Sequence, residues 1–154
     1  MSWSFPLTAY STFTFFTLSL TGHHSSLRIF HSTCFQIQKD TGLWYSVEYS
    51  SFSLGPEADK YRLSVSGFSG DEGDAIAAAF YPAMNANGMQ FSCLGEDNDM
   101  HPTAHCGGGL YGWWFNRCTR SLINLDFNGS WNAVDAALRP TYDVVCSRML
   151  VKLD

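Results

Sequence analysis

Two aspartates separated by one residue have the spacing of cation ligands. Asp97 and Asp99 alternate in a polar loop, so both carboxylates can turn inward while intervening backbone carbonyls supply further oxygens. Such donors suit a hard cation such as Ca²⁺, so this loop is a candidate cation site. From Leu63 to Asn116 there are six acidic residues and no basic one, so a cation would also relieve a negative field. The alternative is an Asx-type turn with solvated carboxylates.

A second candidate for metal chemistry follows directly in the chain. His101, His105, Cys106 and Cys118 carry the nitrogen and sulfur atoms that zinc prefers. Their spacing matches no standard structural zinc pattern, and a second close cysteine pair is missing. The spacing therefore argues against zinc, and we interpret both histidines as surface loop residues rather than side-chain ligands.

Nothing in the sequence indicates catalysis. The glycines at 107–109 could suggest a phosphate-binding loop, but no lysine or helix start follows them. The serines lack the G-x-S-x-G context of an activated nucleophile, and no histidine and acid are placed to activate them. The sequence predicts a protein that is not an enzyme.

The composition limits the kinds of partner. With 154 residues, 45% of them apolar and 16% aromatic, the chain suits one modest globular domain. The net charge of -5 argues against nucleic acid or an acidic membrane surface as partner, because both recruit basic patches. Neutral and cationic ligands remain open.

The N-terminal residues differ from the rest. Met1 to Leu20 is apolar, aromatic and uncharged, which favours a divergent export signal or an unstructured leader over residues 1–26. Pro6, Tyr10 and several hydroxyl residues interrupt the apolar stretch, so it is not predicted to span a membrane. We expect the folded part to cover residues 27–154.

Alternating hydrophobicity predicts the strands that would position the acidic loop. Phe35–Ile37 and Trp44–Tyr49 have the pattern of a hairpin with a turn at 39–42, and Tyr61–Val65 predicts a further strand after the Gly55-Pro56 break.

A short helix and an insertion are predicted next. Asp71, Glu72 and Asp74 precede Ala75–Ala79, where negative charge suits a helix start, and Pro82 prevents a longer helix. We interpret residues 74–87 as a surface insertion.

Three sequence blocks resemble the fibrinogen-related domain, the globular module of fibrinogen chains, ficolins, tenascins and angiopoietins. They are YSSFSLGPEADKYRLSVSGFSGDEG from Tyr49, NGMQFSCLGEDND from Asn87 and GWWFNRC from Gly112. A weaker match, YDVVCSRMLVK from Tyr142, falls where the family has a terminal strand. The resemblance implies an α+β fold, mostly antiparallel β with short helices and a long Gly-rich loop region, as a partial fibrinogen C-terminal domain truncated at its N-terminus.

The resemblance also implies a set of Ca²⁺ ligands. The family uses two aspartate side chains and the backbone carbonyls two and four residues beyond the second. Carried over to this sequence, the ligands are Asp97 and Asp99 by carboxylate, and His101 and Thr103 by carbonyl.

Covalent features follow from the same resemblance. The family closes a disulfide that corresponds to Cys106–Cys118, which leaves Cys34, Cys93 and Cys146 without a partner. For each of these three, we expect a small apolar residue in the interior. Asn128 begins a glycosylation triplet, which has meaning only in an exported chain.

In ficolin-like and tachylectin-like members, a pocket beside the calcium loop binds acetyl groups, and the peptide bond before the second cysteine can be cis. The matching positions are the backbone N–H groups of Cys118 and Thr119, with an aromatic wall from Tyr111 or Trp114. Thr119 stands where lectin members often carry histidine. The segment 131–142 is too short for the Tyr-Ala-Asp-Gly loop that completes the pocket.

Three hypotheses follow for a secreted, extracellular and non-catalytic module. The first is calcium-dependent, lectin-like binding of acetylated glycans in innate defence. The second is interaction with an extracellular protein, of the matrix or receptor-ligand kind, which loss of the acetyl pocket would favour. The third is a degenerate fragment that does not fold alone. Oligomerisation in a longer form of the protein is left open.

Overall fold

The computed structural model describes residues 28–30, 32–77, 82–109, 111–124, 129–130 and 143–152. The predicted leader over residues 1–26, the glycosylation residue Asn128 and the shortened segment 131–142 lie outside these ranges, whereas Gly129 and Ser130 of the glycosylation triplet form a strand. None of the helical elements in the described ranges has the length and hydropathy to cross a bilayer.

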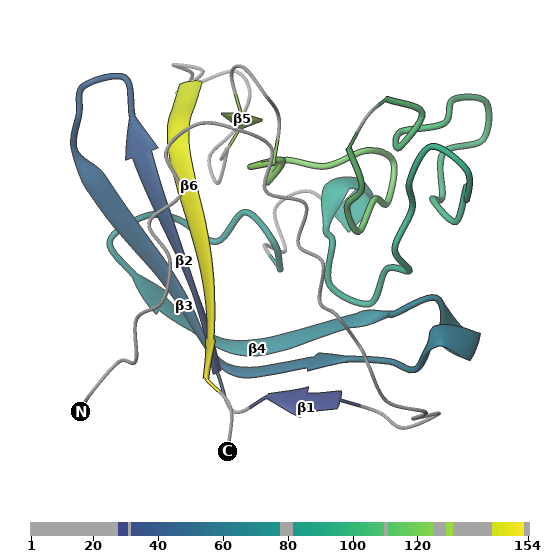
Figure 1. Ribbon diagram of the computed structural model, residues 1–154, viewed down its shortest axis with the longest axis horizontal. Coiled ribbons are helices and arrows are strands. Elements are labelled where there is room, and N and C mark those ends of the chain that lie inside the picture. Colours follow the sequence, from purple (N-terminus) through teal and green to yellow (C-terminus); the bar gives the residue numbers. More distant parts are fainter. Residues whose placement is uncertain are drawn as a thin grey trace.

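One antiparallel sheet runs through the described residues (Figure 1). Its strands are β1 Arg28–Phe30, β2 Ser32–Lys39, β3 Trp44–Leu54, β4 Leu63–Gly70, β5 Gly129–Ser130 and β6 Asp143–Lys152. The strand order is β1-β3-β2-β6-β5, and β4 also pairs with β3. The helical elements described are two 3₁₀ turns, η1 Glu57–Asp59 and η2 Pro82–Met84. The prediction of a mostly antiparallel β fold is therefore confirmed.

The predicted hairpin is formed by β2 and β3. Phe35 pairs with Val47 and Ile37 pairs with Tyr45, so the alternating apolar residues share one face of the sheet. The turn closes with a hydrogen bond of 2.9 Å from the Gly42 N–H to the Lys39 carbonyl. Gly42 has φ +81°, a conformation in which a side chain would be strained.

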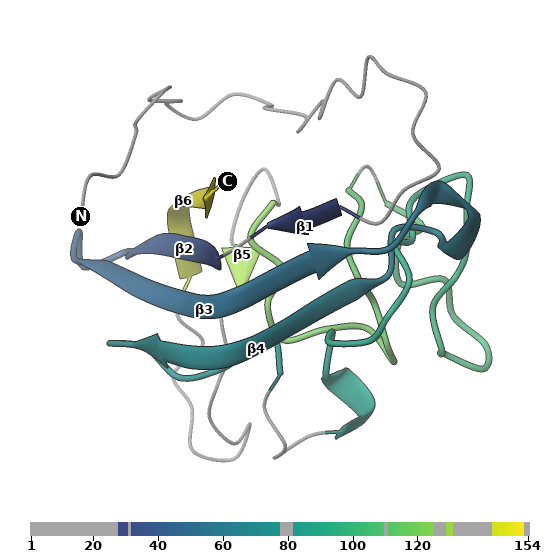
Figure 2. The same cartoon turned by 90° about the horizontal axis from the view of Figure 1, so that it is seen from below.

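The core lies between the inner face of this sheet and the glycine-rich loops. Figures 1 and 2 show the loops of residues 85–124 gathered on one side of the sheet. Fully buried strand residues on that side include Phe35, Ile37, Val47, Tyr49, Phe52 and Leu63. The loops contribute Trp113, Trp114, Phe115 and Ile123 to the same cluster. Loops without regular structure are thus fixed by aromatic side chains that pack on the sheet.

The segment from Asp71 to Asn87 differs from its prediction. Its described part, up to Ala77, contains bends and no helix, and η2 follows at residues 82–84. Nor is it a surface insertion throughout, since Ile76 and Ala86 are fully buried and the Ala86 N–H donates to the Ile76 carbonyl at 2.9 Å. Asp74 Oδ1 accepts the N–H groups of Ile76 and Ala77, a local turn that competes with a helix.

Candidate functional site

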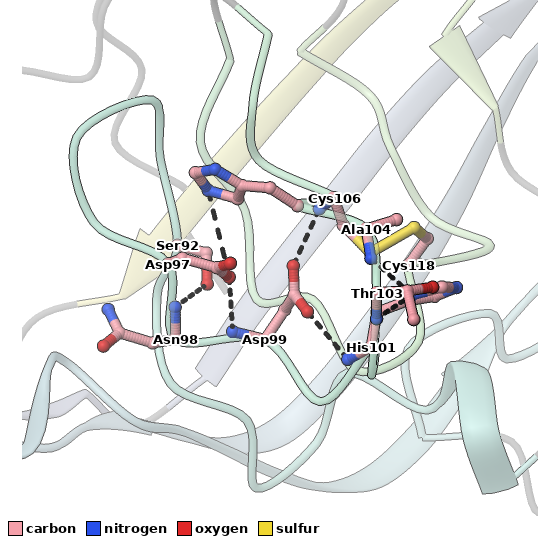
Figure 3. Close-up of a disulfide and its surroundings, with 10 residues drawn as sticks. Ser92, Asp97, Asn98, Asp99, His101, Thr103, Ala104, Cys106 and Cys118 are labelled. Carbon is pink, nitrogen blue, oxygen red and sulfur yellow. Dashed lines mark hydrogen bonds and ion pairs between the residues drawn. A yellow bond between two sulfur atoms is a disulfide. The ribbon is translucent and has the colours of Figure 1, made fainter.

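The acidic loop is attached to the rest of the molecule by the residue between its aspartates (Figure 3). The hydroxyl of the fully buried Ser92 accepts the Asn98 backbone N–H at 2.9 Å, and the Asn98 side-chain amide donates to the Phe91 carbonyl at 2.8 Å. Ser92 exchanges two backbone hydrogen bonds with Trp113, at 2.9 and 3.0 Å. Asn98 therefore connects the loop to the aromatic core and leaves the carboxylates of its two neighbours for other partners.

Asp99 organises the chain that follows it. Its Oδ1 accepts the N–H of His101 and its Oδ2 accepts the N–H of Cys106, both at 2.7 Å. Asp97 Oδ1 accepts the Asp99 N–H at 3.3 Å and lies 3.9 Å from Nε2 of His105. Each aspartate thus bonds a backbone N–H two residues on, as the Asx-turn alternative predicts. This does not exclude a cation, since each carboxylate oxygen carries two lone pairs.

Several oxygens of this loop accept no hydrogen bond from a described residue and have the chemistry of ligands for a hard cation. Within the described ranges, Asp97 Oδ2 and the carbonyls of His101 and Thr103 accept no hydrogen bond. The ring Nδ1 of His101 accepts the N–H groups of Thr103 at 3.3 Å and Ala104 at 2.9 Å, which tightens the turn that carries both carbonyls. Asp97, Asp99, His101 and Thr103 are thus the residues that would hold Ca²⁺, with water completing its usual six to eight oxygens.

Two lysines compensate part of the negative charge that the sequence predicts for the acidic region. Lys60 Nζ lies 3.0 Å from Glu96 Oε2, and the ammonium holds the pKa of that carboxyl below its ordinary value. Lys39 forms an ion pair with Glu72. Both lysines precede Leu63 in the chain, so a count over neighbouring residues does not find them. No lysine or arginine of the described residues pairs with Asp97 or Asp99, and negative charge remains at the candidate site.

The predicted disulfide is confirmed. Cys106 and Cys118 are bonded, with Cα atoms 5.1 Å apart. Because both cysteines are bonded to each other, neither is available as a zinc ligand. The described residues contain no group of three or more His, Cys, Asp or Glu side chains that could hold a metal. Because Cys106 also donates its N–H to Asp99, the bridge and the acidic loop share one residue.

The segment just before Cys118 is held by residues 82–85. The Asn116 side-chain amide donates to the Pro82 carbonyl at 2.9 Å and to the Asn85 carbonyl at 3.3 Å. The Asn116 carbonyl accepts the Met100 N–H at 2.9 Å, and the Arg117 N–H donates to Ala83. Asn116 therefore joins η2, the acidic loop and the disulfide segment.

The residues predicted to bind acetyl groups are only partly available. Neither the Cys118 nor the Thr119 N–H donates to a described residue, so both could serve an external acceptor. Trp114 is 8% exposed and donates Nε1–H to the Tyr61 carbonyl at 2.8 Å, so little of its ring can contact a ligand. Tyr111 is half-buried and remains the candidate aromatic wall. The Arg117–Cys118 peptide bond is trans, and Cys118 has φ +62°.

Three cysteines are free thiols, namely Cys34, Cys93 and Cys146. Only Cys34 is fully buried; burial, with smaller contributions from Glu48 and Asp71, raises the pKa of its thiol to about 11. This agrees with a small interior residue for Cys34, whereas Cys93 and Cys146 are half-buried.

Sequence reasoning missed Asn98 and Asn116. Each lies in a block that carries the family resemblance, Asn98 between the two aspartates and Asn116 two positions before Cys118. An asparagine gives no signal of its own, because its role depends on carbonyls that are not adjacent to it in the sequence.

Comparison with known proteins places this architecture. The family model of the fibrinogen beta and gamma chains, C-terminal globular domain, matches residues 24–137. The Protein scabrous of Drosophila melanogaster is 34% identical over 131 residues, which cover 84% of this chain and 15% of that protein. The chain thus spans a small part of this curated relative.

Solved structures show the same fold. The fibrinogen-like globe domain of human ANGPTL6 superposes with a TM-score of 0.65 at 24% identity, covering 82% of this chain and 58% of that one. A lamprey fibrin D-dimer, solved with the peptide Gly-His-Arg-Pro-amide, has a TM-score of 0.63 at 25% identity, covering 79% of this chain and 45% of that one. Together with the family match, the sheet and the disulfide, these likenesses show that the chain belongs to the family of the fibrinogen C-terminal globular domain.

Proposed function

We propose that this chain is a non-catalytic, extracellular recognition module in which Ca²⁺ orders the loop of residues 97–106. The observation that carries the proposal is the double role of Asp99, whose two oxygens hold the N–H groups of His101 and Cys106. A cation shared by Asp97 and Asp99 would neutralise their charge and fix the loop together with the disulfide. Bound Ca²⁺ would supply this order and no covalent chemistry.

The first candidate ligand is an acetylated glycan. The N–H groups of Cys118 and Thr119 donate to no described residue, and the disulfide fixes Cys118 beside the acidic loop. An acetyl oxygen could accept from these donors, with its methyl group against Tyr111. The bond from the Ser121 N–H to Thr119 Oγ1, at 3.2 Å, orients this segment.

The second candidate is an extracellular protein or peptide. Two apolar side chains flank the acidic loop and face solvent, Leu94 at 57% and Met100 at 62% exposure. Exposed apolar residues beside a charged rim are typical of protein interfaces. The lamprey relative was solved with a peptide ligand, which adds support for this alternative.

A melting curve of the oxidised chain tests the calcium proposal. Ca²⁺ at millimolar concentration should raise the melting temperature, and the rise should disappear with chelator and in Asp97→Asn and Asp99→Asn. Asp40→Asn, which removes the same charge from the exposed hairpin turn, should keep the response. An equal calcium response in all variants would contradict the proposal.

Retention on an N-acetylglucosamine resin separates the two ligand classes. The glycan candidate predicts retention that free acetate and chelator both reverse. A calcium-dependent rise in melting temperature without retention would favour the protein partner, and Leu94→Ser with Met100→Ser would then weaken capture of that partner.

A further inference from the structure

A polar cavity lies on the outer face of the sheet, opposite the core and the acidic loop. Gln36 of β2 pairs with Ser46 of β3 and with Arg148 of β6, so these three residues form one row across the strands. The row points away from the core because its neighbours Phe35 and Val47 point into it. The lining is completed by Trp44, Asp71 and Tyr45, although Tyr45 also packs against the core, and the cavity measures about 340 Å³, at the small end of the range of ligand sites.

The cavity holds two opposite charges that do not pair with each other. Arg148 forms no ion pair with a carboxylate of the described residues; its guanidinium carbon lies 4.6 Å from the centre of the Trp44 ring. Asp71 accepts the Ser46 N–H on Oδ1 at 2.5 Å and returns its own N–H to the Ser46 carbonyl at 3.1 Å. Its Oδ2 accepts no bond from a described residue. Both groups are therefore held in place with hydrogen-bonding capacity unused.

The other lining residues supply an aromatic surface and polar groups that can form hydrogen bonds. Trp44 is 40% exposed even with Arg148 over its ring, so part of an aromatic face is open to a ligand. The Gln36 amide and the Ser46 hydroxyl have no partner among the described residues. An open aromatic face beside amide, hydroxyl and carboxylate groups suits a hydroxylated ring.

We propose that this cavity binds a sugar acid of the hexuronate class. The ligand carboxylate would bind the guanidinium of Arg148, whose planar fork matches carboxylate geometry. Ring hydroxyls would donate to Asp71 and exchange hydrogen bonds with Gln36 and Ser46, and the apolar face of the ring would cover Trp44. A neutral sugar leaves Arg148 unused, and a simple carboxylate leaves Asp71 and Gln36 unused. The site is independent of the calcium loop and lies on the opposite face of the sheet.

Titration of the full chain with D-glucuronate tests the proposal. Backbone amide signals of Gln36, Ser46 and Arg148 should shift and saturate, whereas D-glucose and acetate at the same concentration should give much weaker binding. Arg148→Gln should weaken glucuronate binding by about tenfold or more, as expected for loss of a charge-assisted pair. The affinity of Arg148→Lys for glucuronate should lie between those of the wild type and Arg148→Gln, because lysine keeps the positive charge but lacks the planar guanidinium group.

Two controls keep the result specific. Lys152→Gln removes the same charge from an exposed position of the same strand and should leave binding unchanged. Melting curves of all variants check that the fold is retained, and Asp71→Asn gives a second variant that should weaken binding while keeping the lining intact.

Four results would overturn the proposal. The first three are equal binding of glucose, undiminished binding by Arg148→Gln, and binding of a dipeptide with a free carboxylate as tight as that of glucuronate, which would assign the cavity to peptide ends. Binding should persist in chelator. Loss of glucuronate binding in chelator would place the ligand at the calcium loop instead, so failure of this site and failure of the calcium proposal are distinguishable.

Discussion

Replacing Cys106 and Cys118 together by alanine should lower the free energy of unfolding by about 3 kcal/mol. The bridge joins residues separated by 12 positions, and the loop-closure relation gives roughly that value for a loop of this length. For a chain of this size, each kcal/mol corresponds to about 2–4 °C, so the melting temperature should fall by about 6–12 °C. Urea unfolding followed by tryptophan fluorescence measures the change.

The matched control is Cys93→Ala. Cys93 is a half-buried free thiol in the same loop region, so its replacement removes a sulfur without opening a bridge, and should cost about 1 kcal/mol or less. A double variant that loses no more stability than this control would refute the loop-closure reasoning. Reduction of the unmodified chain with dithiothreitol should reproduce the effect of the double variant.

The same double variant also probes the acidic loop. Cys106 donates its backbone N–H to Asp99 Oδ2, so opening the bridge frees the partner that orients one predicted calcium ligand. Calcium affinity, measured by calorimetry, should therefore fall in the double variant and remain in Cys93→Ala. Unchanged affinity would mean that the aspartates are positioned without the bridge.

The remaining predictions concern the sheet and its neighbours. Tyr49→Phe should lower the free energy of unfolding, measured by urea titration, by about 1–2 kcal/mol, because the buried hydroxyl donates to Asp74 at 2.5 Å. An unchanged free energy of unfolding would show that other interactions replace this hydrogen bond. Gly70→Ala should destabilise by more than 2 kcal/mol, since Gly70 has φ +144° and an added Cβ would overlap the backbone of β3; a folded variant of normal melting temperature would contradict this. The pKa of Glu96 is held down by Lys60, so its pairing stabilises above the unfolded-state pKa of about 4.3 and is lost as pH falls through the lower folded value. The difference in melting temperature between wild type and Glu96→Gln should therefore shrink as the pH falls below about 4.3, and a difference that stays constant there would exclude the ion pair as its cause.

The strands could be predicted from the sequence because their signal is local. Alternation of Phe35 and Ile37 with polar residues marks β2, and the apolar face it predicts is the face that is buried. Which strands become neighbours is a different matter. β2 pairs with β6, more than a hundred residues later, and no local pattern specifies that partner.

The sequence predicted the short-range features of the candidate site and missed those that depend on residues far apart in the chain. The D-N-D spacing and the cysteine pair are short-range features with a family precedent, and the disulfide formed as expected. Lys60 reaches Glu96 across 36 positions, and Ile76 is buried although the acidic residues before it favoured a helix start in a surface insertion. The reach of a long side chain explains the ion pair, and tertiary packing explains the buried isoleucine. The spacing of residues in the sequence predicts neither of them.

The position of β6 has a consequence for synthesis. It lies between β2 and β5, and Ser32 pairs with Lys152 across 120 residues. During translation, β2 and β3 can form their hairpin early, but one edge of β2 stays open until β6 emerges from the ribosome. The nascent chain therefore presents an unpaired strand edge while the more than one hundred residues between β2 and β6 are made, a state in which chaperone binding or aggregation competes with completion of the sheet.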